Sequence, residues 1–136
     1  MRGIIQRLCW ILLFAAVLQA EHISWQGSYD QAHQKALKEN KLLMVLLIDE
    51  NCPLCHKMLR TTFMDQPYIK KINEKFVSAL VRKGQKESYP IEMLYTLEYP
   101  SVFFLNGEEL FVGENIYGYA DAEMFGELLD TNAMLD

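Results

Sequence analysis

Helical patterns and short, wholly apolar runs alternate along the chain. Residues 42–48 are seven apolar residues in a row, which is typical of a strand buried on both faces of a mostly parallel sheet. Before that run, Ser28 and Gln31 form a capping box, which predicts a helix over residues 28–39. The apolar residues of this helix recur on one face: Tyr29, Ala32, Ala36 and Leu37.

Two more helices are expected after the buried strand. Pro53 stands in the first turn of a helix that begins at a pair of cysteines. Its apolar residues keep helical spacing: Cys55, Met58, Leu59 and Phe63. Asp65 can cap a further helix over residues 66–75, with Pro67 in its first turn. The buried face of that helix should hold Ile69, Ile72 and Phe76.

Strands are expected to dominate the next part of the chain. Residues 76–81 predict one strand and residues 101–105 another. Between them we expect a polar loop over residues 83–90 and a short helix over residues 91–97.

The chain should close with a hairpin and a helix. Asn106-Gly107 is a strong hairpin signal, after which residues 110–112 are expected to return antiparallel. Asp121 can cap a last helix. Four of its residues should point inward: Met124, Phe125, Leu128 and Leu129. The order α-β-α-α-β-α-β-β-α predicts an α/β domain with a central mixed sheet of about four strands flanked by helices.

The first twenty residues predict a secretory signal peptide. Two basic residues, Arg2 and Arg7, precede an apolar run over residues 8–18, and the small Ala20 precedes the charged Glu21. Because a bilayer span takes about twenty residues, this shorter run favours cleavage over a permanent anchor, which is the alternative. The expected domains are therefore a signal peptide at 1–20 and one compact domain at 21–136, in the periplasm or another extracytoplasmic space.

The balance of charged residues limits the classes of binding partner that the chain can have. Lys and Arg number 13 against 18 Asp and Glu, and the formal net charge is −5. An acidic chain does not neutralise phosphates, so we expect no nucleic-acid binding. After loss of the signal peptide no stable membrane span is expected.

Only Cys52 and Cys55 remain once Cys9 leaves with the signal peptide. A disulfide closing so short a loop adds little stability, so structural reinforcement explains the pair poorly. At a helix N-terminus, unpaired N–H groups and the helix dipole should favour a Cys52 thiolate, below the free thiol pKa of about 8.5. Cys52 would then attack a substrate disulfide, and Cys55, one turn on, would resolve the mixed disulfide.

Metal binding is the alternative use of the cysteines. A tetrahedral zinc site needs two further ligands, and the chain has no second CxxC. The chain has enough histidines to complete a Cys2His2 site, namely His22, His33 and His56. A metal carrier therefore stays an alternative, although no metal or other cofactor is expected beyond the redox-active disulfide.

A second motif, Tyr99-Pro100, directly precedes the strand at 101–105. With the buried strand, the Cys52-Pro53-Leu54-Cys55 motif, the Asn106-Gly107 hairpin and the closing helix, it makes the chain resemble the thioredoxin superfamily. Residues after the motif are similar to the C-terminal periplasmic domain of the membrane thiol:disulfide interchange protein. They are Lys57-Met58, Thr62-Phe63, Ile69 and Lys75-Phe76-Val77.

The resemblance implies a thioredoxin fold and roles for particular residues. It makes Cys52 the attacking cysteine, Cys55 the resolving one and Pro100 a cis-proline beside the substrate. Tyr99, Pro53 and Leu54 are then expected to line the substrate site. The chain departs from the family pattern at Leu46, where the family has a buried acid. It departs again at Arg60, where the family has a helix-kinking proline, so the helix is expected to break between Thr61 and Asp65.

The function expected is an exported thiol:disulfide oxidoreductase that reduces protein disulfides or relays electrons to them. Its partners would be exported proteins with disulfides or a membrane thiol reductase. The motif does not fix the direction of electron flow, so a disulfide oxidase or isomerase is one alternative. A redox-silent binding module or chaperone is another, for which exposed Tyr99, Tyr117 and Tyr119 would be the apolar surface.

Overall fold

The structure is a computed structural model, and it describes residues 3–4, 20–85, 89–90 and 92–131. Most of the expected signal peptide, residues 1–2 and 5–19, therefore lies outside the described residues. Within the described ranges, no helix is long and apolar enough to cross a membrane.

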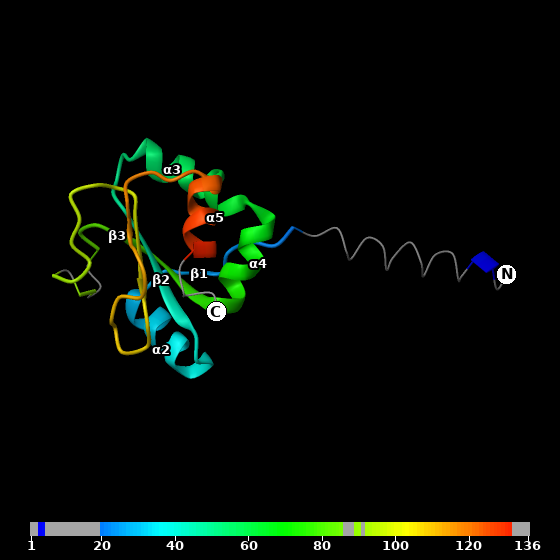
Figure 1. The fold of residues 1–136 in the computed structure, drawn as a ribbon, viewed down its shortest axis with the longest axis horizontal. Helices are drawn as coiled ribbons and strands as arrows, with labels where there is room; N and C mark the ends of the chain where they lie inside the picture. The colour runs from blue at the N-terminus through cyan, green and yellow to red at the C-terminus, as the bar shows by residue number, and fades with distance from the viewer. Residues whose placement is uncertain (1–2, 5–19, 86–88, 91, 132–136) are drawn as a thin grey trace.

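A five-stranded mixed sheet forms the centre of the fold (Figure 1). The strands lie in the order β1-β3-β2-β4-β5. Their bounds are Trp25–Gln26 for β1, Leu42–Ile48 for β2, Phe76–Arg82 for β3, Ser101–Leu105 for β4 and Ile116–Tyr117 for β5. β2 is central, parallel to β3 and antiparallel to β4. The prediction of about four strands is close. Three of the predicted strands are present as β2, β3 and β4, residues 110–112 form no strand, and the two-residue edge strands β1 and β5 were not predicted.

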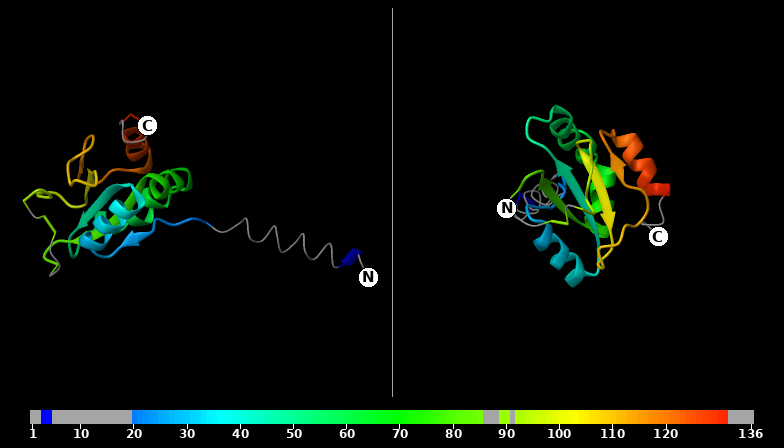
Figure 2. Two further views of the ribbon diagram at one scale, coloured as in Figure 1. Left: turned by 90° about the horizontal axis from the view of Figure 1, so that it is seen from below. Right: turned by 90° about the vertical axis from the view of Figure 1, so that its left-hand side faces the viewer.

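Helices cover both faces of the sheet (Figure 2). Their bounds are Tyr29–Glu39 for α2, Pro53–Arg60 for α3, Gln66–Lys75 for α4 and Ala122–Thr131 for α5, with a 3₁₀ turn, η1, at Thr62–Met64. Alternate residues of β2 serve the two faces, because successive strand side chains point in opposite directions. Leu43, Val45 and Leu47 pack with α2, whereas Met44, Leu46 and Ile48 pack with α3, α4 and α5. The apolar run of β2 is thus explained by burial on both sides.

Local hydrogen bonds fix the helix ends that the sequence predicted. The Ser28 hydroxyl accepts from the Gln31 N–H at 3.4 Å, and the Asp121 carboxylate accepts from the Met124 N–H at 2.8 Å. Asp65 occupies the N-cap of α4, but only its backbone carbonyl bonds to the helix. α3 ends at Arg60, Thr61 is its C-cap and η1 follows, so the predicted break between Thr61 and Asp65 is confirmed.

The predicted helix over 91–97 is wrong for its described part. Residues 92–94 form a turn, in which the Met93 and Leu94 N–H groups donate to the Pro90 carbonyl. After the turn, the Thr96 hydroxyl accepts from the Glu98 N–H at 3.0 Å. Such side-chain bonds to nearby backbone compete with helical ones, so the chain bends instead.

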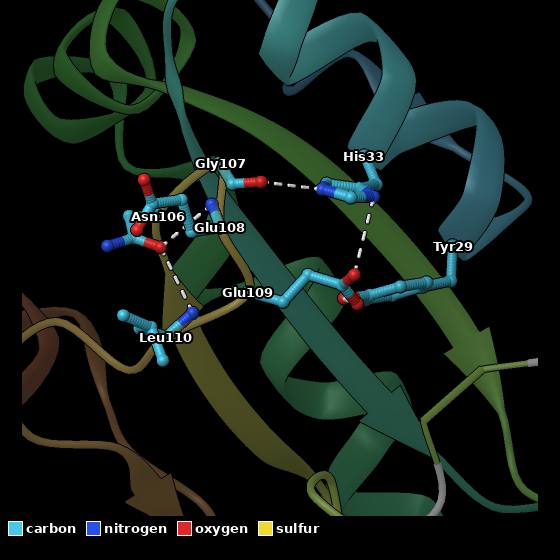
Figure 3. A network of polar contacts seen from close by, with 7 residues as sticks. All are labelled: Tyr29, His33, Asn106, Gly107, Glu108, Glu109 and Leu110. Carbon is cyan, nitrogen blue, oxygen red and sulfur yellow. Dashed lines mark hydrogen bonds and ion pairs between the residues drawn. The ribbon is translucent and has the colours of Figure 1, made fainter.

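The hairpin after β4 also differs from expectation. Residues 110–112 form no strand and make one isolated bridge, Phe111 to Leu105, while the strand that pairs with β4 is β5. In the connecting turn it is Glu109, not Asn106 or Gly107, that takes a left-handed φ of 62°. The Asn106 amide oxygen accepts from the Glu108 and Leu110 N–H groups, both at 3.0 Å (Figure 3).

Two helix positions expected to be inward are exposed. Leu37 is at the edge of the α2 face that Tyr29, Ala32 and Ala36 bury, and it is 56% exposed beside Gly107. Met124 is likewise 57% exposed, because Phe125 and Leu129, four residues apart, centre the buried face of α5. The other inward positions of α5 agree with the prediction.

Candidate active site

The cysteine pair lies where β2 ends and the chain turns into α3. Asn51 has a left-handed φ of 54°, a conformation that asparagine tolerates better than most residues. That turn places Cys52 at the N-cap of α3 and Pro53 at its first position. Proline suits this position because its missing N–H would have no helical partner there.

A disulfide joins Cys52 and Cys55, whose Cα atoms are 5.2 Å apart. The Cys52 sulfur also accepts from the Cys55 backbone N–H at 3.1 Å, which caps the helix. The two sulfurs differ in accessibility. Cys55 is 1% exposed within the apolar core, whereas Cys52 is only partly buried. An incoming disulfide therefore meets Cys52 first.

Leu46 lies on the core face that also holds Cys55, and it is fully buried. The carboxylate that the family carries at this point is thus replaced by a hydrocarbon side chain. The acid nearest to Leu46 in the sequence is Asp49, and its carboxylate accepts a hydrogen bond from the Glu50 N–H at 2.8 Å. Cys55 consequently sits in apolar surroundings.

Tyr99 and Pro100 lie directly beside the cysteines. The peptide bond between them is cis, and Pro100 is buried. The antiparallel pairing of β2 and β4 sets Ser101 opposite Leu47, so the start of β4 meets the end of β2. The Tyr99 carbonyl oxygen is 3.7 Å from the Cys52 sulfur.

The Tyr99 side chain is held between charged and aromatic neighbours. The Lys83 ammonium is 5.4 Å from the centre of its ring. Burial raises the pKa of the Tyr99 hydroxyl, and nearby Tyr89 and Asp49 raise it further. The phenol is therefore neutral near pH 7.

The remaining predicted site residues, Pro53 and Leu54, are exposed on the first turn of α3, and Leu54 is 47% accessible. An open groove of about 580 Å³ borders this turn. Its lining is Asn51, Cys52, Pro53, His56 and Arg60. A larger open cavity of about 850 Å³ lies at the opposite end of the sheet, and neither cysteine lines it.

His56 and Arg60 are site residues that were not predicted. The sequence does contain a signal for them, because Cys52, His56 and Arg60 are spaced four residues apart and so share one helical stripe. The sequence patterns used above instead point to His56 only as a possible zinc ligand and to Arg60 only as the replacement of a proline.

The structure does not bring His22 or His33 to the cysteines, and His56 is the histidine that shares the groove with Cys52 in the described chain. His33 is 2.8 Å from the Gly107 carbonyl, at the end of the sheet where β2 begins, and the His22 carbonyl bonds to Asn73. Among the described residues, no group of three or more His, Cys, Asp and Glu side chains converges as a metal site would need.

A disulfide between cysteines three residues apart, at the first turn of a helix on such a sheet, is the arrangement of a thiol:disulfide oxidoreductase. The chain belongs to the family described as "Thioredoxin-like domain", whose model matches residues 29–133. This confirms the resemblance inferred from the sequence. No curated protein sequence matches the chain at a significant level.

Solved structures share the fold. A putative disulphide-isomerase from Bacteroides thetaiotaomicron is 26% identical, with a TM-score of 0.67 over 82% of this chain and 91% of that one. The DsbH oxidoreductase is 14% identical, with a TM-score of 0.65 over 82% and 85% of the two chains. The oxidised C-terminal domain of Neisseria meningitidis DsbD is 18% identical, with a TM-score of 0.60 over 76% and 91%.

Proposed function

We propose that the chain is an exported reductase or electron relay for protein disulfides, with Cys52 as the attacking cysteine and Cys55 as the resolving one. The observation that carries the proposal is the asymmetry of the pair. Cys52 is accessible, and its sulfur accepts a hydrogen bond from the Cys55 backbone N–H at 3.1 Å, whereas Cys55 is 1% exposed. An N–H aimed at sulfur stabilises a thiolate more than a neutral thiol.

The reaction starts from the reduced pair. The Cys52 thiolate attacks one sulfur of a substrate disulfide, the substrate S–S bond breaks, and its other sulfur leaves as a thiolate that takes up a proton. The Cys55 thiol then loses its proton and attacks the Cys52 sulfur. The second substrate thiol leaves, the Cys52–Cys55 disulfide forms, and the substrate has gained two electrons. A dithiol reductant must reduce the Cys52–Cys55 disulfide before another cycle can begin.

Tyr99 and Pro100 are proposed to hold the substrate on one side of Cys52, and Pro53 and Leu54 on the other. The Tyr99 carbonyl oxygen lies 3.7 Å from the Cys52 sulfur, within reach of a backbone segment bound there. Leu54 offers an exposed apolar side chain on the first turn of α3. An extended peptide between these elements would bring its disulfide to Cys52.

The signal-like pattern at residues 1–20 supports export to the periplasm or another extracytoplasmic space, with the domain at 21–136 as the mature protein. The substrates would then be exported proteins with disulfides, and the electron donor a membrane thiol reductase. Oxidase or isomerase activity uses the same residues and differs only in the reduction potential of the pair.

Single cysteine variants test the roles. Reduced protein is mixed with insulin, whose interchain disulfides precipitate the B chain when cleaved, and turbidity is followed. We expect Cys52→Ser to abolish reduction and Cys55→Ser to accumulate a mixed disulfide that dithiothreitol releases. Insulin reduction by Cys52→Ser at the unaltered rate would refute the assignment.

A further inference from the structure

The groove beside Cys52 has a basic wall on an acidic protein. The wall is formed by two side chains of α3, His56 and Arg60, and the helix carries no Asp or Glu. Lys57, also on α3, has its ammonium 4.8 Å from the centre of the Tyr119 ring and does not line the groove. The chain as a whole has a formal net charge of −5. We call the groove lined by Asn51, Cys52, Pro53, His56 and Arg60 the cationic groove.

Hydrogen bonds set the spacing within the cationic groove. The His56 backbone N–H donates to the Cys52 carbonyl at 3.2 Å. The Arg60 side-chain Nε donates to the His56 carbonyl at 3.3 Å. Arg60 is thus anchored through one nitrogen on the stripe that begins at the attacking sulfur. Its two terminal NH₂ groups carry the remaining donors, in a geometry suited to a carboxylate.

No acidic side chain of the protein neutralises this arginine in the part of the chain that is described. The ion pairs found there are His33 with Glu109 and Lys71 with Asp130. Asp49 and Glu50 precede the motif, and neither forms an ion pair with Arg60. The guanidinium therefore faces the groove with its charge available to a ligand.

We propose that the cationic groove binds a carboxylate carried by the substrate close to the disulfide that Cys52 attacks. This rests on the proposed function and adds the class of substrate, disulfides with an acidic group beside the cysteine. His56 and Arg60 lie one and two turns beyond Cys52, about 6 and 12 Å along the axis. An extended peptide advances about 3.3 Å per residue, so the acid belongs about two to four residues from the cysteine.

Two peptide disulfides test the proposal, the homodimers of acetyl-Gly-Cys-Gly-Glu-Gly-amide and of its Gln counterpart. Oxidation of the reduced full chain by each is quenched with acid and followed by alkylation and mass shift. At low salt we expect the Glu peptide to react about fivefold faster, and about 0.5 M salt to remove most of that preference. The same peptides are also reacted with dithiothreitol, to correct for any difference in their intrinsic reactivity.

Charge variants assign the preference to the groove. Arg60→Gln should bring the Glu/Gln rate ratio close to one, and Arg60→Lys should retain part of it. Lys38→Gln removes the same charge from exposed α2, on the opposite face of the sheet, and should leave the ratio unchanged. Glutathione disulfide, a small disulfide with carboxylates, tests whether the carboxylate must be carried by a peptide. If Arg60→Gln slows its reaction, the substrate class includes small disulfides. If Arg60→Gln leaves that rate unchanged, the class is restricted to peptides.

Two results overturn the inference while leaving the proposed function intact. One is equal rates for the Glu and Gln peptides with the wild-type chain, after the dithiothreitol correction. The other is a preference that Arg60→Gln does not change. Failure of the reduced chain to react with either peptide would instead refute the proposed function, and the carboxylate site with it.

Discussion

The sulfur of Cys52 lies 3.7 Å from the carbonyl oxygen of Tyr99, although 47 residues separate them in the chain. The contact follows from sheet register, because β4 begins where β2 ends. In the disulfide this sulfur has no proton, so the contact is not a hydrogen bond. On reduction a Cys52 thiol can donate to the carbonyl, whereas a thiolate cannot and depends on the Cys55 N–H instead.

Differential alkylation tests the asymmetry of the cysteines. Iodoacetamide added to the reduced chain should modify Cys52 at least about tenfold faster than Cys55, because thiolate character and access both govern the rate. Quenched samples digested and analysed by mass spectrometry give the two rates separately. Equal rates in the folded protein would contradict the assignment of Cys52 as the attacking residue.

Gly126 in α5 is covered by the ring of Tyr68 from α4, so a Cβ at this position would collide with the ring. We expect Gly126→Ala to lower the free energy of unfolding by about 1–3 kcal/mol, measured by urea denaturation. Gly27→Ala is the matched control, since a Cβ there meets no atom within 4 Å. In a Tyr68→Ala background the cost of Gly126→Ala should largely disappear. An unchanged cost there would show that the ring is not its cause.

Thr62 ties η1 to the loop before α5. Its buried hydroxyl donates to the Ala120 carbonyl at 2.6 Å. Thr62→Val keeps the shape but leaves that carbonyl without its donor, so we expect a loss of about 1–3 kcal/mol in urea denaturation. Thr61→Val serves as the exposed control, because water can replace its 2.7 Å bond to the Lys57 carbonyl. Equal losses in the two variants would argue against burial as the cause.

Tyr29 holds the turn after β4 through a 2.7 Å hydrogen bond to the Glu109 carboxylate (Figure 3). Burial raises the pKa of the Tyr29 hydroxyl above its ordinary value of 10.0, and the Glu109 bond and charge raise it further. The stability that goes with this raised pKa is complete below pH 10.0 and is lost above it, because the unfolded chain then ionises first. Tyr29→Phe should therefore lose less stability than wild type between neutral pH and pH above 10.0. Tyr117→Phe, at an exposed tyrosine, should behave as wild type, and parallel unfolding curves for wild type and Tyr29→Phe would contradict this.

Long periodic segments made most of the fold predictable from the sequence. The run of β2 and the helical spacing of α2, α3, α4 and α5 each extend over seven or more residues. β1 and β5 have two residues each, too few for any period, and their pairing depends on strands far away in sequence. At residues 92–101 the hydroxyls of Thr96 and Ser101 bond to Glu98 backbone groups, and no helical periodicity reveals this.

The candidate site was predictable where a motif names its residues and was missed where only spacing does. The cysteine motif and Tyr99-Pro100 pointed to four of the residues that the structure brings together. His56 and Arg60 lack a motif, and their place beside Cys52 follows from the helical stripe of α3. The charge of the groove emerges only once that stripe is compared with the acidic remainder of the protein.

The most direct test of the account is the equilibrium reduction potential of the Cys52–Cys55 pair. The chain is equilibrated in dithiothreitol or glutathione buffers, and the reduced fraction is read by alkylation and mass shift. The account predicts a reversible two-electron couple below about −200 mV, towards the reducing end of thioredoxin-like proteins. A couple near about −120 mV would make the chain a donor of disulfides, and the absence of any reversible couple would contradict thiol–disulfide exchange altogether.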